Sequence, residues 1–298
     1  MRSDCHIHVR GGEKGEDVLR AMDRAGLDLI CPICWPPEAT KADPLDPSRR
    51  LSNAERMAET GRMLAADSER IRALYWVDPR DEDAPEQVEC AVSEYKYAGI
   101  KMIPDHWHPY EERIFPVYER IQTLGVPILF HVGILWANAD SSRFCRPADY
   151  EIMQEFPRVP FLLGHIGWPW TDECIAVADR FKTLARLADG RDGELMRDLA
   201  FRHRNLHKRE LEVPVQCKVD LTPGTPPVYR TDALRKCYEV LGADMLVFGS
   251  DLLGADDLAG VRAHQERDER IFRDELGLSE EDIDRIMGTN VLTLFGGS

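Results

Sequence analysis

Short apolar runs alternate with longer amphipathic stretches along this 298-residue chain, and no other feature limits the fold as strongly. Apolar runs of about four to eight residues are typical of buried strands, whereas the longer stretches have the periodicity of helices with one covered face. Repeated strand and helix units build a parallel sheet. The expected strands are Ser3 to Val9, Leu27 to Pro32, Ala73 to Val77, Gly99 to Ile103, Pro127 to Val132, Pro160 to His165, Gln216 to Leu221 and Met245 to Ser250.

Helical stretches fill the intervals between these runs. They are Gly15 to Ala25, Ser52 to Arg70, Pro85 to Tyr97, Pro116 to Leu124, Asp172 to Leu187 and Thr231 to Leu241, followed by Leu258 to Leu276 and Ser279 to Met287. Because (β/α)8 barrels commonly take about 250 residues in one unit, we expect an α/β fold of this type, a TIM barrel with additional C-terminal helices. We expect a single domain over 1–298, with a surface insertion at the charged, Arg-rich segment 188–212.

Composition excludes several classes of partner. The formal net charge is −15 with 43% hydrophobic and 31% charged residues, which describes a soluble globular protein that repels nucleic acid and anionic membranes. No apolar run approaches a membrane span, and the N-terminus lacks the apolar core of a signal peptide. The scattered cysteines, Cys31 and Cys34 included, are typical of reduced core residues. We therefore expect a cytoplasmic protein with a small-molecule partner.

Two imidazoles stand two residues apart in the opening Asp4-Cys5-His6-Ile7-His8. Successive side chains of a strand point to opposite faces, so His6 and His8 share one face. Two neutral nitrogens that converge from one strand suit a divalent cation. The pair alone is a weak signal, because the chain contains a second pair, His106 and His108, in an expected loop.

Further polar residues stand at the carboxyl ends of other strands, where barrel enzymes assemble their chemistry. His131 and His165 lie near or at the ends of two expected strands, Asp251 directly follows another, and Lys101 lies within a fourth. Each is costly to bury unless it is paired or ligated. Singly, each has a structural explanation, as a hydrogen-bonded core histidine or a helix cap. Together they favour a metal centre.

In order and spacing, these segments resemble the amidohydrolase superfamily, specifically its amidohydrolase-related branch of decarboxylases and lactonases. The resemblance is carried by Asp4-Cys5-His6-Ile7-His8, Gly99-Ile100-Lys101, Phe130-His131, Gly164-His165-Ile166-Gly167, Phe248-Gly249-Ser250-Asp251 and the closing Gly288-Thr289-Asn290 to Phe295-Gly296. It covers nearly the whole chain. It implies a barrel with a divalent metal at its mouth, usually zinc and sometimes manganese.

Position by position, the resemblance makes His6, His8, His131 and Asp251 the ligands of one ion, with His165 beside the reacting carbon. Such an ion can lower the pKa of bound water to about 7 or polarise a carbonyl. Asp251 would then accept the proton of the water, and His165 would act as a hydrogen-bond donor or as a general acid or base.

Lys101 leaves the number of ions open. In binuclear members of the superfamily, a strand-four lysine becomes a carbamate that bridges two metals, and the residue matching His165 holds the second. The branch that this chain resembles usually works with one metal, and there a strand-four lysine can bind substrate as an ammonium. We favour one ion.

All the tryptophans fall in or soon after an expected strand: Trp35, Trp76, Trp107, Trp136, Trp168 and Trp170. Side chains in these loops line the mouth of a barrel, so their placement indicates a pocket suited to an unsaturated or ring-derived substrate. Arg10 follows the first two ligands, where a guanidinium can pair with a substrate carboxylate. The candidate substrate contacts are Arg10, His106, Trp107, Trp136 and Trp168.

We therefore expect a metal-dependent hydrolase that acts on a small carboxylated or cyclic substrate through metal-activated water. The alternative is a non-hydrolytic decarboxylase of an unsaturated acid, because fold and ligands are shared and the loops choose the substrate. A catalytically silent, ligand-binding barrel is a weaker hypothesis, since a buried carboxylate beside three imidazoles is costly without a cation. The resemblance also implies a homodimer.

Overall fold

A computed structural model describes residues 1–37, 49–135, 141–188 and 216–295. All of its strands belong to one parallel sheet, in the order β8-β7-β6-β5-β4-β3-β2-β1-β9. The strands are β1 Ser3–His8, β2 Leu29–Ile33, β3 Leu74–Trp76, β4 Gly99–Met102, β5 Ile128–Phe130, β6 Phe161–Leu163, β7 Cys217–Asp220, β8 Leu246–Val247 and β9 Leu252–Leu253. Eight of them confirm the expected strands, each with its ends within a few residues.

Strand β1 closes the sheet into a barrel. It pairs with β2 on one side and with β9 on the other. Next to β9, the Cys5 N–H donates to the Phe248 carbonyl at 3.1 Å, and the Asp251 N–H donates to the His6 carbonyl at 2.8 Å. The end of the eighth strand is thereby joined to the first, and the predicted TIM barrel is confirmed.

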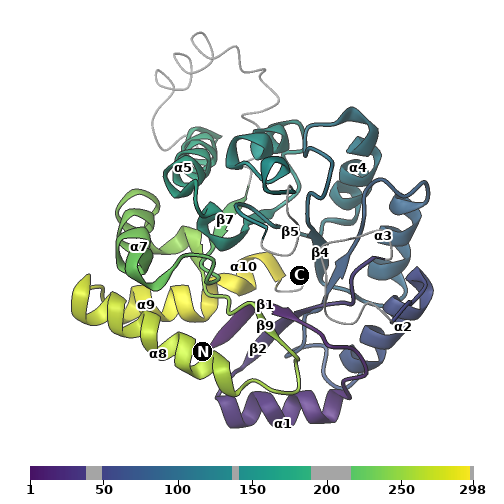
Figure 1. Cartoon of the computed structure of the whole chain (residues 1–298), viewed down its shortest axis with the longest axis horizontal. Coiled ribbons are helices and arrows are strands. Elements are labelled where there is room, and N and C mark those ends of the chain that lie inside the picture. The colour runs from purple at the N-terminus through teal and green to yellow at the C-terminus, as the bar shows by residue number, and fades with distance from the viewer. Residues whose placement is uncertain (38–48, 136–140, 189–215, 296–298) are drawn as a thin grey trace.

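Helices surround the sheet as a ring in Figure 1. They are α1 Gly15–Ala25, α2 Asn53–Leu64, α3 Ala84–Ser93, α4 Phe115–Leu124, α5 Thr171–Ala188, α7 Pro227–Leu241, α8 Ala259–Arg270, α9 Glu280–Met287 and α10 Leu292–Phe295. Between β5 and β6 the described chain forms 3-10 segments at Ser141–Phe144 and Pro147–Glu155 in place of an α-helix. The segment predicted as an insertion lies outside the described residues, apart from Ala188.

Local signals explain where several helices start and stop. Ser52 and Glu55 form a capping box at the start of α2, and Ser279 accepts from the Asp282 N–H at the start of α9. Helix α1 is capped at its C-terminus by Gly26, whose φ of 69° is the left-handed conformation that glycine adopts without strain. These caps satisfy backbone groups that a helix end otherwise leaves unpaired.

The amino ends of the strands are covered by the C-terminal helices. In Figure 1, α10 lies across the centre of the ring. Phe295, which is 2% exposed, packs so closely against Gly99 that a Cβ there would lie 3.0 Å from its ring. A side chain at this first residue of β4 would also meet the Pro127 carbonyl oxygen at 2.9 Å and Leu74 at 3.0 Å, so only glycine fits.

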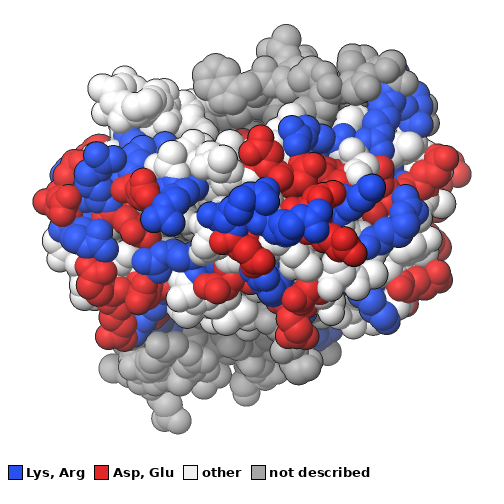
Figure 2. Space-filling model, turned by 90° about the horizontal axis from the view of Figure 1, so that it is seen from below, with Lys and Arg blue, Asp and Glu red and all other residues white. Residues whose placement is uncertain are grey.

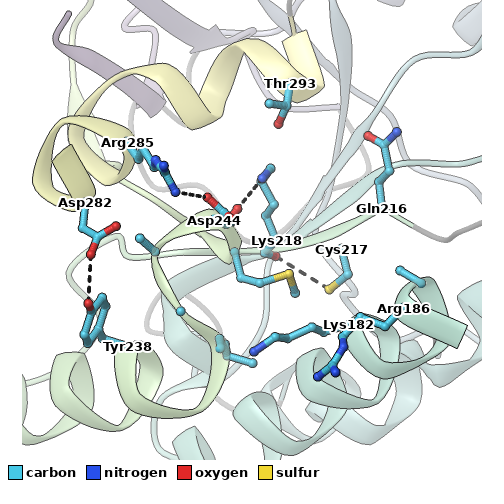
Figure 3. Close-up of a pocket in the computed structure, with 15 residues that line it drawn as sticks. Lys182, Arg186, Gln216, Cys217, Lys218, Tyr238, Asp244, Asp282, Arg285 and Thr293 are labelled. Carbon is cyan, nitrogen blue, oxygen red and sulfur yellow. Dashed lines mark hydrogen bonds and ion pairs between the residues drawn. The ribbon is translucent and has the colours of Figure 1, made fainter. Parts of the chain in front are cut away.

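A cavity of about 660 Å³ also lies at these amino ends, between α5, α7 and α9 (Figure 3). The lysine and arginine side chains that line it bond to neighbouring backbone and side-chain groups. Lys182 donates to the Val240 carbonyl at 2.8 Å in the last turn of α7, Lys218 donates to the Asp244 carbonyl, and Arg285 pairs with the Asp244 carboxylate at 3.0 Å. A cation near a helix C-terminus stabilises the helix, so Lys182 stabilises the end of α7.

The described helices contain no segment that is both long and apolar enough to cross a membrane. Figure 2 shows Lys and Arg interspersed with Asp and Glu over the face that it presents, with no block of a single sign. Ion pairs join charges of opposite sign on the surface, among them Arg2 with Glu269 and with Asp284.

We expect Asp268→Ala to lower the free energy of unfolding by about 3–5 kcal/mol, because it breaks a buried ion pair. Asp268 is fully buried and pairs with Arg230, which is 2% exposed, at 2.5 Å. Removing one partner leaves the other charge buried without compensation. Urea unfolding of both proteins measures the effect, and a loss below about 1 kcal/mol, as for an exposed pair, would contradict it.

Candidate metal centre

Three donor groups converge at the carboxyl end of the barrel. His6 and His8 extend from β1, and Asp251 lies in the turn between β8 and β9. The Nε2 atoms of His6 and His8 lie 3.4 Å and 3.3 Å from the Asp251 Oδ1 atom. Ligands about 2.1 Å from a tetrahedral zinc ion are separated by about 3.4 Å. Nitrogen and carboxylate donors at these separations fit a divalent cation.

The surroundings of these groups favour the protonation states that bind a cation. His6 is fully buried, and burial, reinforced by the charge of Lys101, lowers the pKa of its imidazole to about 3. Burial alone would raise the pKa of Asp251, but the neighbouring His6, His8 and His165 outweigh it and hold that pKa well below its usual value. The centre therefore presents a neutral imidazole and an ionised carboxylate, the states in which both bind metals.

His165 and His131 form a second layer of rings beside this group. The His165 ring lies 5.0 Å from that of His6 and 4.6 Å from that of His131, and its Nδ1 atom is 4.0 Å from Asp251 Oδ2. His131 Nε2 is 3.1 Å from the Ile134 carbonyl. A carbonyl only accepts, so Nε2 is protonated and Nδ1 keeps its lone pair. His131 lies outside the group of three donors and stays a predicted ligand.

Lys101 reaches the same centre from β4. Its side chain is fully buried, and the Nζ atom donates to His6 Nε2 at 3.1 Å. Burial lowers the pKa of Lys101 to about 8, against the opposing effect of the Asp251 and Asp220 carboxylates. As an ammonium, this lysine can bind an anionic substrate. As a free amine, it can react with carbon dioxide and form a carbamate. The sequence left both roles open.

Strained backbone holds two of these side chains in place. Asp251 has a φ of 59°, and His165 and Ile166 have φ values of 58° and 53°. Left-handed backbone costs about 1–3 kcal/mol at residues other than glycine, most at β-branched ones such as Ile166. Strain of this kind persists where surrounding contacts enforce it, and it is concentrated here at the carboxyl ends of β6 and β8.

Sequence reasoning missed two residues of the centre, Asp220 and Thr222. Both are fully buried, and both approach the Nδ1 atom of His6 from the end of β7. The available signal was a carboxylate at the end of an expected strand, but that strand also contains Lys218, and the partner of Asp220 lies 214 residues away in the chain. The pattern of β7 alone could not reveal that contact.

The predicted substrate contacts occupy different settings. Arg10 is 47% exposed and pairs with Asp256 at 2.5 Å, whereas His106 is 42% exposed with its Nδ1 atom 2.5 Å from Asp105. Trp168 packs against Tyr229, with 5.0 Å between ring centroids. Trp107 is 1% exposed and packs in the core. Trp136 lies outside the described residues.

A parallel barrel with imidazole and carboxylate donors at the carboxyl ends of its strands defines a class of metal-dependent barrel enzymes. A family model described as amidohydrolase matches residues 3–297, and the chain belongs to that family. This membership agrees with the resemblance found in the sequence.

Individual relatives are more distant. Dihydroorotase from Erwinia tasmaniensis is 26% identical over 175 residues, which are 55% of this chain and 47% of that protein. The chain thus spans about half the length of the curated relatives that it matches. A manganese-containing structure of 5-carboxyvanillate decarboxylase from Novosphingobium aromaticivorans has a TM-score of 0.59 and 14% identity, covering 99% of this chain and 97% of that one. A zinc-containing amidohydrolase from Burkholderia multivorans has a TM-score of 0.54 and 16% identity, covering 99% of both. At these identities, the structural likeness supports the fold.

Proposed function

We propose that this protein hydrolyses a small carboxylated or cyclic substrate, such as a lactone or an amide, with one zinc ion held by His6, His8, His131 and Asp251. The observation that carries the proposal is the spacing of the His6, His8 and Asp251 donor atoms, which suits a tetrahedral ion. Manganese is the other candidate metal. When bound, such an ion polarises a carbonyl and lowers the pKa of water.

Other steps of the proposed reaction are assigned to side chains of the centre. Asp251 has a carboxylate that is 36% exposed and can accept a proton from the attacking water at Oδ2. His165, whose Nδ1 atom faces that oxygen at 4.0 Å, can stabilise the developing oxyanion or return the proton to the leaving group. Arg10, His106 and Trp168 are proposed to contact the rest of the substrate.

Product analysis tests the reaction. The metal-loaded protein is incubated in oxygen-18 water with lactones and cyclic amides that carry a carboxylate, and with unsaturated carboxylic acids. Hydrolysis predicts one labelled oxygen in each product and no carbon dioxide. Release of carbon dioxide, together with an organic product that carries no labelled oxygen, would overturn this proposal and establish the decarboxylase. The Asp251→Ala variant is the control for background reaction.

We expect Lys101→Met to leave about one ion per chain and to raise KM about tenfold, because a charge-assisted contact to an anionic substrate is lost. Its buried Nζ atom lies 3.1 Å from His6 Nε2, the nitrogen that is proposed to bind the ion. Elemental analysis and steady-state kinetics measure both quantities. A wild type with two ions and a variant that loses at least one would instead assign Lys101 as a bridging carbamate.

The cytoplasmic location and the homodimer are proposals as well. All the cysteines are free, and most of them are buried in the core, as expected where thiols stay reduced. The dimer rests on the family resemblance.

A further inference from the structure

The imidazole of His6 is held from behind by Asp220. The Oδ2 atom of Asp220 lies 2.6 Å from His6 Nδ1, and both side chains are fully buried. The Thr222 hydroxyl lies 3.1 Å from the same nitrogen. An ionised carboxylate only accepts hydrogen bonds, so Nδ1 carries the proton and Nε2 keeps its lone pair. That lone pair faces Asp251 and Lys101.

The other oxygen of Asp220 fixes the direction of the carboxylate. Oδ1 accepts the Thr222 N–H at 2.9 Å and the Cys5 thiol at 3.6 Å, and it also accepts the Thr222 hydroxyl. Within the described ranges, Asp220 forms no ion pair with a lysine or an arginine. These contacts to Oδ1 leave Oδ2 directed at His6, whose neutral imidazole donates the Nδ1 hydrogen bond.

Asp220 acts through His6 and does not take part in the cluster itself. The three donors that lie within 4.8 Å of one another are His6, His8 and Asp251. Asp220 contacts the opposite nitrogen of the His6 ring. A carboxylate at that nitrogen fixes the orientation of a ligating histidine and raises the basicity of its other nitrogen.

We infer that Asp220, supported by Thr222, is a positioning residue that fixes His6 in the Nδ1-protonated tautomer and thereby strengthens the binding of a divalent ion. The inference rests on the proposed metal centre and adds a residue from β7 to it. Without the carboxylate, the proton of the His6 ring can lie on Nε2 instead of Nδ1. A protonated Nε2 has no lone pair with which to bind a cation.

Two measurements on the same variants test this role. In metal-free protein, nitrogen NMR of labelled histidine reports the tautomer, and we expect Nδ1-protonated His6 in the wild type and a mixture in Asp220→Asn. Competition with a chromophoric chelator reports zinc affinity, and we expect the dissociation constant to rise about 10- to 100-fold. Thr222→Val, which keeps the carboxylate, should weaken zinc binding less and serves if Asp220→Asn does not fold.

Asp268→Asn is the matched control, because Asp268 is equally buried but pairs with Arg230. It should lose stability while it keeps wild-type zinc affinity and the wild-type His6 tautomer. Unchanged zinc affinity in Asp220→Asn, or an equal loss in Asp268→Asn, would overturn the inference. A wild type that binds no metal would reject the proposed function, whereas the tautomer of His6 would still test the role of Asp220.

Discussion

Replacing Asp251 with alanine should lower kcat/KM about a thousandfold or more. The substitution removes a proposed metal ligand together with the proposed proton acceptor, and a positioned acid or base alone contributes about 10²- to 10⁴-fold. It also leaves His6 and His8 without the oxygen that lies 3.4 Å and 3.3 Å from their Nε2 atoms. Steady-state kinetics with the substrate identified by product analysis measure the effect.

Asp257→Ala provides the control for this experiment. Asp257 is an exposed aspartate in the same loop. Its backbone N–H, which the substitution keeps, bonds to the Gly254 carbonyl. The activity of the Asp257→Ala variant should equal that of the wild type. If the Asp251→Ala variant turned over at the wild-type rate, neither role assigned to the carboxylate could stand.

Removal of the metal should abolish activity and lower the melting temperature. A bound ion at 100 times its dissociation constant stabilises the folded state by about 2.7 kcal/mol, because it binds the folded chain alone. Without the ion, the Asp251 charge in this centre is balanced by Lys101 and by the partial charges of the imidazoles. Dialysis against a chelator, followed by calorimetry and an activity assay, measures both losses.

Added zinc or manganese should restore activity and melting temperature together in the wild type. A His6→Ala, His8→Ala double variant should show neither recovery, because it lacks both imidazoles of β1. Full activity in protein that elemental analysis shows to be free of metal would contradict a metal-dependent reaction.

The sequence predicted those parts of the fold that depend on local patterns. Strict alternation placed His6 and His8 on one face of β1, and the predicted bounds of α1, Gly15 to Ala25, equal those observed. The segment 141–155 gave no helical prediction, and it forms 3-10 structure. Strand β9 has only two residues, too few for an alternating pattern to appear.

The contacts within the centre depend on register and backbone geometry that no local pattern contains. Asp251 turns toward His6 and His8 because its φ is 59° and its N–H bonds to the His6 carbonyl. Asp220 lies behind His6 because β7 and β1 both line the barrel, although they are distant in sequence. Trp107 follows β4 as predicted, yet the loop turns its ring into the core.

Elemental analysis of purified protein, with metal counted per chain, tests the metal centre most directly. We predict a value near one in the wild type and near zero in the His6→Ala, His8→Ala double variant. A value near two would indicate a second ion and would assign Lys101 as the carbamate that bridges the two ions. Equal metal content in the wild type and in the double variant would contradict a centre built on β1.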